Sequence, residues 1–369
     1  MSLGGRTRTW SLFATDTLSL SERWHATLSG RYNRSTVSNR DQLNPGGGAD
    51  SLDGDHRFQR FNPAVGLTYT PSRAWNAYAG YSEGSRTPTA IELGCANPDN
   101  PCKLPNAMAG DPPLKQVVTK TWDFGLRGQA SSVTRWNLGL FRAENHDDIL
   151  FVADDQLGYG YFKNFGKTRR QGVEAGASTA IGALSLALNY TFIDATYRSV
   201  ESVGGAGNST NSAGAGLEGS IAIHPGNRIP LIPRHLVKAS ADYRLTPALS
   251  LGADMIAVSG AFARGNENNQ HQADGSTYLG PGRSAGYALM NLGARYEMSR
   301  GLQLFGQINN LFDRQYASAA QLGSTAFSAG GSVVTRPFGQ VGGDYPQVGS
   351  TFYAPGAPRT FWVGLRYSL

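Results

Sequence analysis

Apolar and polar residues alternate along most of this chain, in segments of about ten residues. The last segment, TFWVGLRYSL, carries apolar side chains at every second position, and VKASADYRL alternates small or apolar residues with Lys238, Asp242 and Arg244. Successive side chains of a β-strand point to opposite faces, so this period of two predicts strands with one apolar and one charged face. Helical spacing is sustained nowhere. The pattern therefore predicts an all-β protein.

The connections between these segments are alternately very short and very long. Short turns are expected at residues 70–74, 129–133, 181–184, 245–249 and 298–301, with a slightly longer one at 20–23. Long loops rich in Gly, Ser, Asn and Pro are expected near residues 38–56, 85–116, 199–234, 265–284 and 318–358. Compact soluble domains rarely carry several such loops, whereas outer-membrane barrels combine tight turns at one rim with long loops at the other. The connections favour an antiparallel transmembrane β-barrel over a soluble sandwich.

Counting strands on this scheme gives about thirteen. They are expected at residues 8–18, 24–37, 57–70, 74–84, 116–128, 134–152, 160–178, 183–198, 235–245, 249–263, 285–297, 302–317 and 358–369. Bacterial single-chain barrels have an even number of strands, and an odd set would leave two unpaired edges in lipid. We therefore expect that a segment upstream of this chain is missing.

Composition changes this picture little. The 369 residues carry a net charge of +6, but Lys and Arg are dispersed along the chain, which argues against a nucleic-acid-binding protein. No run of about 18 apolar residues is present, which excludes a membrane-spanning helix but not a barrel. The N-terminus lacks the pattern of a secretory signal, so the chain is either not exported or has lost its beginning.

Four stretches, in order, resemble TonB-dependent outer-membrane receptors. FNPAVGLTYTPSRAWNAYAGYSEGSRTPTAIEL (residues 61–93) resembles the mid-barrel strand, periplasmic turn and strand of that family, and NFGKTRRQGVEAG (164–176) resembles its Gly-Val-Glu strand. INNLFDRQYAS (308–318) is similar to the penultimate strand, and PRTFWVGLRYSL (358–369) is similar to the terminal one. The four matches span nearly the whole chain.

The resemblance implies a 22-stranded barrel plugged by an N-terminal globular domain. Such receptors lie in the cell outer membrane and import scarce ligands, such as ferric siderophores, with energy from TonB, ExbB and ExbD. Thirteen strands counted from the end would be strands ten to twenty-two. Residues 1–369 are therefore expected to be the C-terminal part of the barrel, with neither plug nor TonB box. The chain departs from the family at Leu369, where members tend to end in an aromatic residue.

The resemblance also indicates where a ligand would bind. The long segment at 85–116 would face outside, and its Arg86, Lys103 and Lys115 suit the carboxylates or catecholates of an anionic metal chelate. A solvated basic loop is the alternative. Aromatic residues of the later loops would stack on a ligand, pack the loops together or join the interfacial aromatic girdle. These aromatic residues are Tyr278, Phe338, Tyr345, Phe352 and Tyr353, of which the first three are the candidate ligand contacts.

The two cysteines, Cys95 and Cys102, lie seven positions apart in the turn-rich stretch GCANPDNPCKLP. An oxidising compartment would join them in a disulfide. Free thiols and a metal pair are the alternatives, although no His or second Cys pair lies nearby at ligand spacing.

The six histidines show no metal-ligand spacing, so we expect no metal site and no cofactor. The triplet His146-Asp147-Asp148 fits neither a metal site nor a cofactor site, but it raises the possibility of an outer-membrane hydrolase. Adjacent strand residues point to opposite faces, which places His146 and Asp147 poorly for joint catalysis. The sequence therefore predicts a receptor that is not an enzyme, with a passive porin-like channel as the main alternative and a hydrolase as the weaker one.

Overall fold

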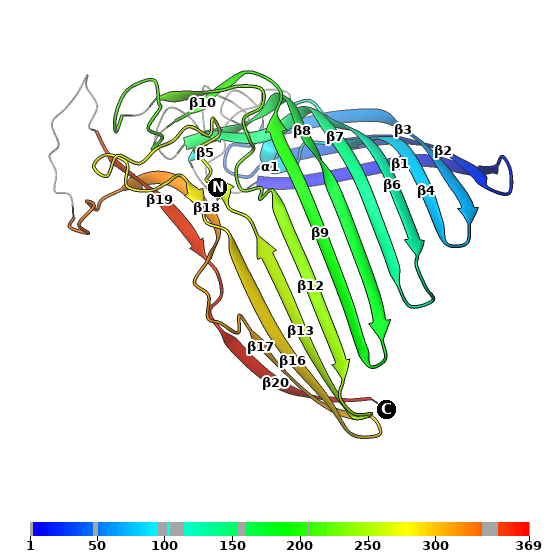
Figure 1. The fold of residues 1–369 in the computed structure, drawn as a ribbon. Helices are drawn as coiled ribbons and strands as arrows, with labels where there is room; N and C mark the ends of the chain where they lie inside the picture. The colour runs from blue at the N-terminus through cyan, green and yellow to red at the C-terminus, as the bar shows by residue number, and fades with distance from the viewer. Residues whose placement is uncertain are drawn as a thin grey trace.

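The computed structural model describes residues 3–46, 51–94, 102–103, 114–153, 159–205, 207–217, 219–333 and 346–368. Thirteen long strands form one antiparallel sheet in the order β1-β2-β3-β4-β6-β7-β8-β9-β12-β13-β16-β17-β20 (Figure 1). They are β1 (Leu3–Ser19), β2 (Trp24–Asp41), β3 (Gly54–Ser72), β4 (Trp75–Arg86), β6 (Val117–Gln129), β7 (Arg135–Ala153), β8 (Tyr159–Ile181), β9 (Leu184–Tyr197), β12 (His235–Arg244), β13 (Leu249–Val258), β16 (Tyr287–Ser299), β17 (Leu302–Asn309) and β20 (Thr360–Tyr367). Each overlaps one strand predicted from the alternation, so the all-β prediction is confirmed.

Tight turns join the strands along one edge of the sheet, here called the turn edge. In Figure 1 this edge runs from the β1–β2 hairpin to the C-terminus, whereas the N-terminus lies near the opposite loop edge. Two of these turns contain Gly182 (φ 59°) and Gly301 (φ 82°), in the left-handed conformation that glycine adopts without steric cost. In the described part of the chain β1 pairs only with β2 and β20 only with β17, so the sheet is open.

The two faces of the sheet differ in chemistry. Residues directly opposite each other on paired strands share a face, so Leu28 lies beside Val65, and Ala239 lies between Leu188 and Met255. Leu28 and Leu188 each expose about half of their surface, at 51% and 52%. Burying such side chains in an apolar medium is favourable, so this apolar face suits lipid.

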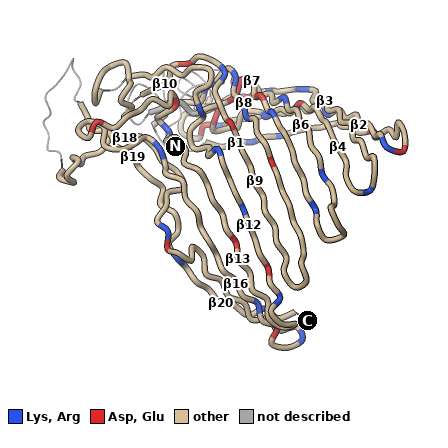
Figure 2. Tube along the Cα trace, in the orientation of Figure 1, with Lys and Arg blue, Asp and Glu red and all other residues tan. Residues whose placement is uncertain are grey.

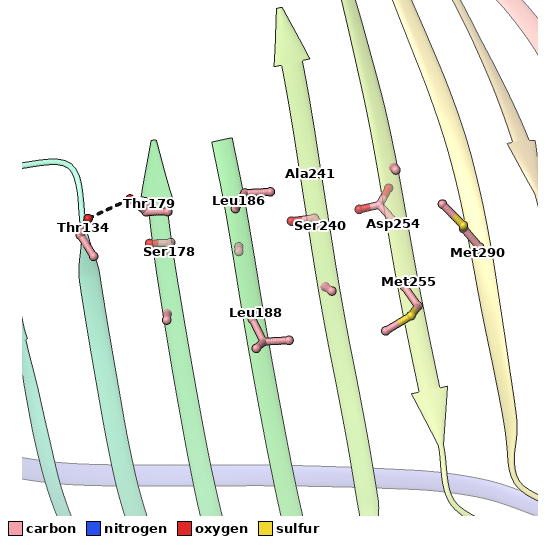
Figure 3. Close-up of a pocket in the computed structure, with 14 residues that line it drawn as sticks. Thr134, Ser178, Thr179, Leu186, Leu188, Ser240, Ala241, Asp254, Met255 and Met290 are labelled. Carbon is pink, nitrogen blue, oxygen red and sulfur yellow. Dashed lines mark hydrogen bonds between the residues drawn. The ribbon is translucent and has the colours of Figure 1, made fainter. Parts of the chain in front are cut away.

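The apolar face is hollowed where small residues lie on adjacent strands. A groove of about 490 Å³ crosses β8 to β16, with Leu186, Leu188, Met255 and Met290 around it (Figure 3). Alanines of β8, β9, β12 and β13 form much of its floor. Its lining is almost wholly apolar, in keeping with the rest of this face.

The opposite, polar face carries hydrogen-bonding side chains along the same strands. Arg127 lies between Asn76 and Asn137 in the register, and its Nε donates a hydrogen bond of 2.9 Å to Asn76. Ser240 lies beside Asp254 in the same way. This alternation is that of a barrel whose lumen is wet.

Aromatic pairs border the apolar face at both ends. Near the turn edge, Trp24 stacks on Tyr69 with ring centroids 4.4 Å apart. Toward the loop edge, Trp10 meets Tyr32 edge-on at 6.3 Å. Two such girdles flank the hydrocarbon region in membrane barrels.

The long connections at the loop edge contain secondary structure that the sequence analysis did not predict. They hold the helix α1 (Ala90–Leu93), the pair β5 (Cys102–Lys103) with β8, and three two-stranded sheets. The sheets are β10 (Glu201–Gly204) with β11 (Ser220–Ile223), β14 (Ala261–Phe262) with β15 (Arg283–Ser284), and β18 (Ala317–Thr325) with β19 (Val348–Pro355). The predicted strand at 302–317 ends early, because Asn310 and Asp313 adopt left-handed conformations with φ of 50°. The predicted strand at 249–263 also ends early, at Val258, and residues 261–262 form β14 in a separate sheet.

The buried apolar clusters also lie at the loop edge. One contains Val37, Leu93, Leu114, Val117 and Ile149, and another is built around Phe165, Tyr197 and Ile221. The core therefore joins loops to strand ends. Among the described residues, the structure contains no helix of the length and apolar character needed to cross a membrane.

Candidate ligand-binding site

The described ends of the connection between β4 and β6, at α1 and Leu114, pack onto the polar face at the loop edge. The helix α1 begins with a capping box, in which the Thr89 hydroxyl accepts from the backbone of Glu92 and the Glu92 carboxylate accepts from the backbone of Thr89. Leu93 and Leu114 are buried against Val37 of β2. The segment that holds the predicted basic side chains is thus anchored by local capping and by apolar burial.

Arg86 ends β4 and is joined to this helix. Its Nη1 lies 2.7 Å from the carboxylate of Glu92, which also accepts a hydrogen bond of 2.8 Å from the Thr89 backbone. The Arg86 side chain remains 46% exposed. Arg86 is therefore held in place by a carboxylate while still facing solvent.

Lys115 lies at the other end of the same connection. Its backbone N–H donates to Asn164 of β8 at 2.8 Å, and the Asn164 amide donates to the backbone oxygen atoms of Lys115 and Asp147. The Lys115 Nζ is 3.9 Å from Asp147, and the side chain is 74% exposed. Lys103 belongs to β5 and pairs with Tyr159 of β8. The three predicted cations thus come from one connection, attached to the loop end of β8.

A polar network that the sequence analysis missed lies next to this connection. Asp148 accepts hydrogen bonds from Thr168 at 2.6 Å and from Asn145 at 3.1 Å. The guanidinium of Arg170 lies 3.6 Å from the same carboxylate. Thr168 and Arg170 are two positions apart in the stretch KTRRQG, a spacing that places both on one face and was the available signal.

The triplet His146-Asp147-Asp148 does not form a continuous strand surface. Asp147 has a φ of 52°, which kinks β7 between His146 and Asp148. His146 is paired with Lys167 in the register, whereas Asp148 turns to Thr168. The carboxylate is engaged with hydroxyl, amide and guanidinium groups and not with the imidazole.

Tyr278 is buried, with 3% of its surface exposed. Its hydroxyl accepts hydrogen bonds from the backbone of Gly216 at 3.0 Å and from the Asn211 amide at 3.3 Å. In this structure it packs the loops together, which is one of the roles left open by the sequence. Phe338, Tyr345 and Cys95 lie outside the described residues, as does the Cys102 side chain.

His271 joins the same two loops. Its Nδ1 accepts a hydrogen bond of 3.0 Å from the backbone of Ser209, and its Nε2 lies 3.0 Å from the carbonyl oxygen of Gly280. Nδ1 accepts and Nε2 donates only in the neutral imidazole. Burial lowers the pKa of His271 below its usual value, in agreement with this tautomer.

Asp274 stabilises the turn that precedes Tyr278. Its carboxylate accepts backbone hydrogen bonds of 2.8 Å from Tyr278, Ser276 and Thr277. These bonds, that from Tyr278 foremost, hold the pKa of Asp274 below its usual value. Across the described ranges, no three His, Cys, Asp or Glu side chains gather in a way that could hold a metal ion.

Comparison with known proteins gives one consistent set of relatives. Residues 2–311 match the family described as TonB dependent receptor-like, beta-barrel. The chain is 20% identical over 324 residues to the probable TonB-dependent siderophore receptor PiuA of Acinetobacter baumannii, a match that covers 87% of this chain and 39% of the relative.

Solved structures of similar shape point the same way. The ferric-catecholate import receptor Fiu of Escherichia coli K12, in its closed form, superposes with a TM-score of 0.66 at 18% identity, over 99% of this chain and 45% of that chain. The siderophore receptor PiuA of Acinetobacter baumannii gives 0.65 at 15% identity, over 99% and 44%. The copper transporter OprC gives 0.66 at 18% identity, over 99% and 48%. The chain thus spans less than half the length of these relatives, and the structural likeness is one of fold.

Proposed function

This chain belongs to the TonB-dependent receptor-like β-barrel family, and from that membership we propose that it forms part of the wall of an outer-membrane receptor for a ferric siderophore. The observation that carries the proposal is the pairing of an apolar face between two aromatic girdles with a polar face on the same strands. A sheet of that kind separates hydrocarbon from a wet lumen. Loops built at one edge supply a surface for capturing a ligand.

We further propose that residues 1–369 are the C-terminal portion of a 22-stranded barrel. Hydrocarbon does not tolerate unpaired backbone groups, so other strands would cover the outer edges of β1 and β20 in a membrane. In this proposal the plug and the TonB box lie outside residues 1–369. The coupling to TonB, ExbB and ExbD would run through those parts.

The proposed cargo is an anionic iron chelate. PiuA and Fiu carry the words siderophore and ferric-catecholate in their names, which supports this class of ligand. In this chain Arg86, Lys103 and Lys115 would supply the positive charge, from the connection between β4 and β6. The copper transporter OprC has the same fold, so the loop chemistry and not the sheet decides the cargo.

The proposal treats the chain as a receptor and not as an enzyme. A hydrolase would need the His146 imidazole to act with a carboxylate, and Asp148 is engaged by Thr168 and Asn145 instead. A passive channel has less support than a receptor, because the family match extends over residues 2–311. No resident cofactor is part of the proposal.

Uptake of radioactive iron by the source bacterium tests this function. Cells that lack the gene for this chain are compared with cells in which the gene is restored, each given iron bound to a catecholate, a hydroxamate or citrate. We expect deletion to abolish uptake from at least one chelate, and the restored gene to recover it. Equal uptake from all three chelates by both kinds of cell would contradict the proposal.

A further inference from the structure

Five arginines gather on the apolar face of the first three strands, at the loop edge. They are Arg6 and Arg8 on β1, Arg34 and Arg40 on β2, and Arg57 on β3, here called the arginine cluster. The register fixes their common face, because Trp10 lies beside Arg34 and Arg8 lies beside Thr36. Thr36 in turn lies beside Arg57. Figure 2 shows charged residues around this edge of the sheet.

Thr36 lies at the centre of the cluster. Arg8 and Arg57 flank it on the neighbouring strands, about 5 Å to either side, and Arg34 is two residues along its own strand, about 7 Å away. Gly4 adds no side chain to this surface. The result is a hollow of about 540 Å³, lined by Gly4, Gly5, Arg6, Arg8, Thr36, Ser38 and Arg40. Arg6, Arg8 and Arg40 line this hollow together with Thr36, and Arg34 and Arg57 lie next to it in the register, so guanidiniums surround a ligand placed over the Thr36 hydroxyl.

The positive charge of this cluster is largely uncompensated. Arg40 forms an ion pair of 3.0 Å with Asp55. The other four guanidiniums form no ion pair with any residue in the part of the chain that the structure describes. On the same face of β6 and β7 the cations are matched instead, since Arg142 lies 2.5 Å from Glu144 and Lys120 lies 4.0 Å from Glu83.

The cluster lies just beyond the aromatic girdle of the loop edge. Trp10 and Tyr32 meet at 6.3 Å, and the Tyr32 hydroxyl donates to Gln59, directly between the apolar band and the arginines. Aromatic rings of a girdle mark the depth where hydrocarbon ends and headgroups begin. In a membrane, the guanidiniums would thus lie at headgroup depth and face outward from the sheet.

We propose that the arginine cluster binds the phosphorylated headgroup of an outer-leaflet lipid. Guanidiniums pair with phosphate through two parallel hydrogen bonds, and basic surfaces at the membrane boundary attract anionic lipid. The fixed register of β1, β2 and β3 holds the charges in place before the lipid arrives. This inference rests on the proposed membrane location and is independent of the cargo.

The test uses the protein as the source bacterium makes it, purified in zwitterionic detergent, with β-structure checked by circular dichroism. Native mass spectrometry then measures binding of diphosphoryl lipid A and of the same lipid with both phosphates removed. The variant Arg8→Gln/Arg34→Gln/Arg57→Gln is compared with Arg31→Gln/Arg127→Gln/Arg244→Gln, which removes the same charge from the polar face. Inorganic phosphate is added as a competitor.

We expect the phosphorylated lipid to bind, the dephosphorylated lipid to bind far less, and the cluster variant to lose at least about tenfold in affinity. The polar-face variant should bind as the unaltered chain does. Equal binding of the two lipids, equal loss in both variants, or displacement of the lipid by millimolar inorganic phosphate would overturn the lipid site and leave the receptor proposal standing.

Discussion

The hydroxyl of Thr168 donates a hydrogen bond of 2.6 Å to the carboxylate of Asp148, and both residues are buried. The bond joins β8 to β7 just beyond the kink at Asp147. Asn145 and Arg170 contribute to the same carboxylate. This network joins the loop ends of β7 and β8, and the segment with Lys115 is hydrogen-bonded to β8. Removing a hydrogen bond of the network should therefore lower the stability of the protein.

Thr168→Val keeps the shape of the side chain and removes its hydroxyl. The buried Asp148 carboxylate then lacks one donor, which we expect to lower the free energy of unfolding by about 1–3 kcal/mol. Denaturant unfolding of the chain in detergent measures the change. The control is Thr17→Val, because the Thr17 hydroxyl contacts Thr27 at an exposed position. That variant should stay within about 0.5 kcal/mol, and an equal loss in both would contradict the role given to Thr168.

Acidification should loosen the contact between His271 and Ser209. Burial places the folded-state pKa of His271 below the unfolded value of 6.5, and the hydrogen bond to Gly280 and the nearby Asp274 oppose this shift only in part. The unfolded state then binds more protons as pH falls. The stability that neutral His271 contributes is therefore complete above pH 6.5 and is lost as pH falls from there toward the folded-state pKa.

Hydrogen exchange of the Ser209 amide checks this pH dependence. After correction for the intrinsic rate, protection should be lower at about pH 5.5 than at about pH 7.5. His271→Gln should remove the step, while His224→Gln, at an exposed loop position, should keep it. Asp274 does not contribute to this step, because its pKa is lowered and the stability that its carboxylate contributes is lost only below pH 3.8. A step that survives His271→Gln would contradict the assignment.

Tyr278→Phe should loosen the loops without changing the sheet. The half-buried Gly216 N–H loses its acceptor, whereas the Asn211 amide keeps the backbone oxygens of Asn208 and Gly214, so we expect a cost of about 1 kcal/mol. We expect faster hydrogen exchange at Gly216 and unchanged exchange in β12. Tyr243→Phe, on the apolar face, is the matched control. Unaltered protection at Gly216 would mean that the tyrosine hydroxyl does not hold these loops.

Lys115→Glu should weaken binding of a ferric catecholate by about tenfold while leaving stability within about 0.5 kcal/mol. The side chain is mostly exposed and lies 3.9 Å from Asp147, so the structure depends little on it. Quenching of tryptophan fluorescence measures the affinity. Arg244→Glu, at the turn edge, reverses a charge far from the loops and should leave the affinity unchanged. Equal affinity of Lys115→Glu and the unaltered chain would remove Lys115 from the proposed contacts.

The strands could be predicted because their signal is local. The alternation of VKASADYRL is contained within β12 and needs no knowledge of its neighbours. The sheet of β10 with β11 escaped prediction, and residues 261–262 of β14 were assigned to the strand predicted at 249–263, because two to four residues carry no period of their own. Their pairing depends on contacts between loops, which alternation does not encode.

The contacts of the site residues likewise divide into those set by neighbouring sequence and those set by distant segments. The sequence analysis named no partner for Arg86, although Thr89 and Glu92 in TAIE have the spacing of a capping box, the local signal that fixes the Glu92 carboxylate near the end of the strand. The partner of Tyr278 was not readable, because Gly216 is 62 residues away and meets it only after both loops have folded. The contact of Thr168 with Asp148 required the register of β7 with β8 and the kink at Asp147.

Spin labels along β12 test the central claim, that the face of Leu188, Ala239 and Met255 meets lipid. Single cysteines at positions 237 to 242 are introduced into the full chain with Cys95 and Cys102 replaced by serine. Accessibility to oxygen and to a water-soluble nickel chelate is then measured in lipid vesicles. We predict a period of two, with Ala239 and Ala241 accessible to oxygen and Ser240 and Asp242 accessible to the chelate. The opposite phase, or equal access of the chelate to all six positions, would contradict the account.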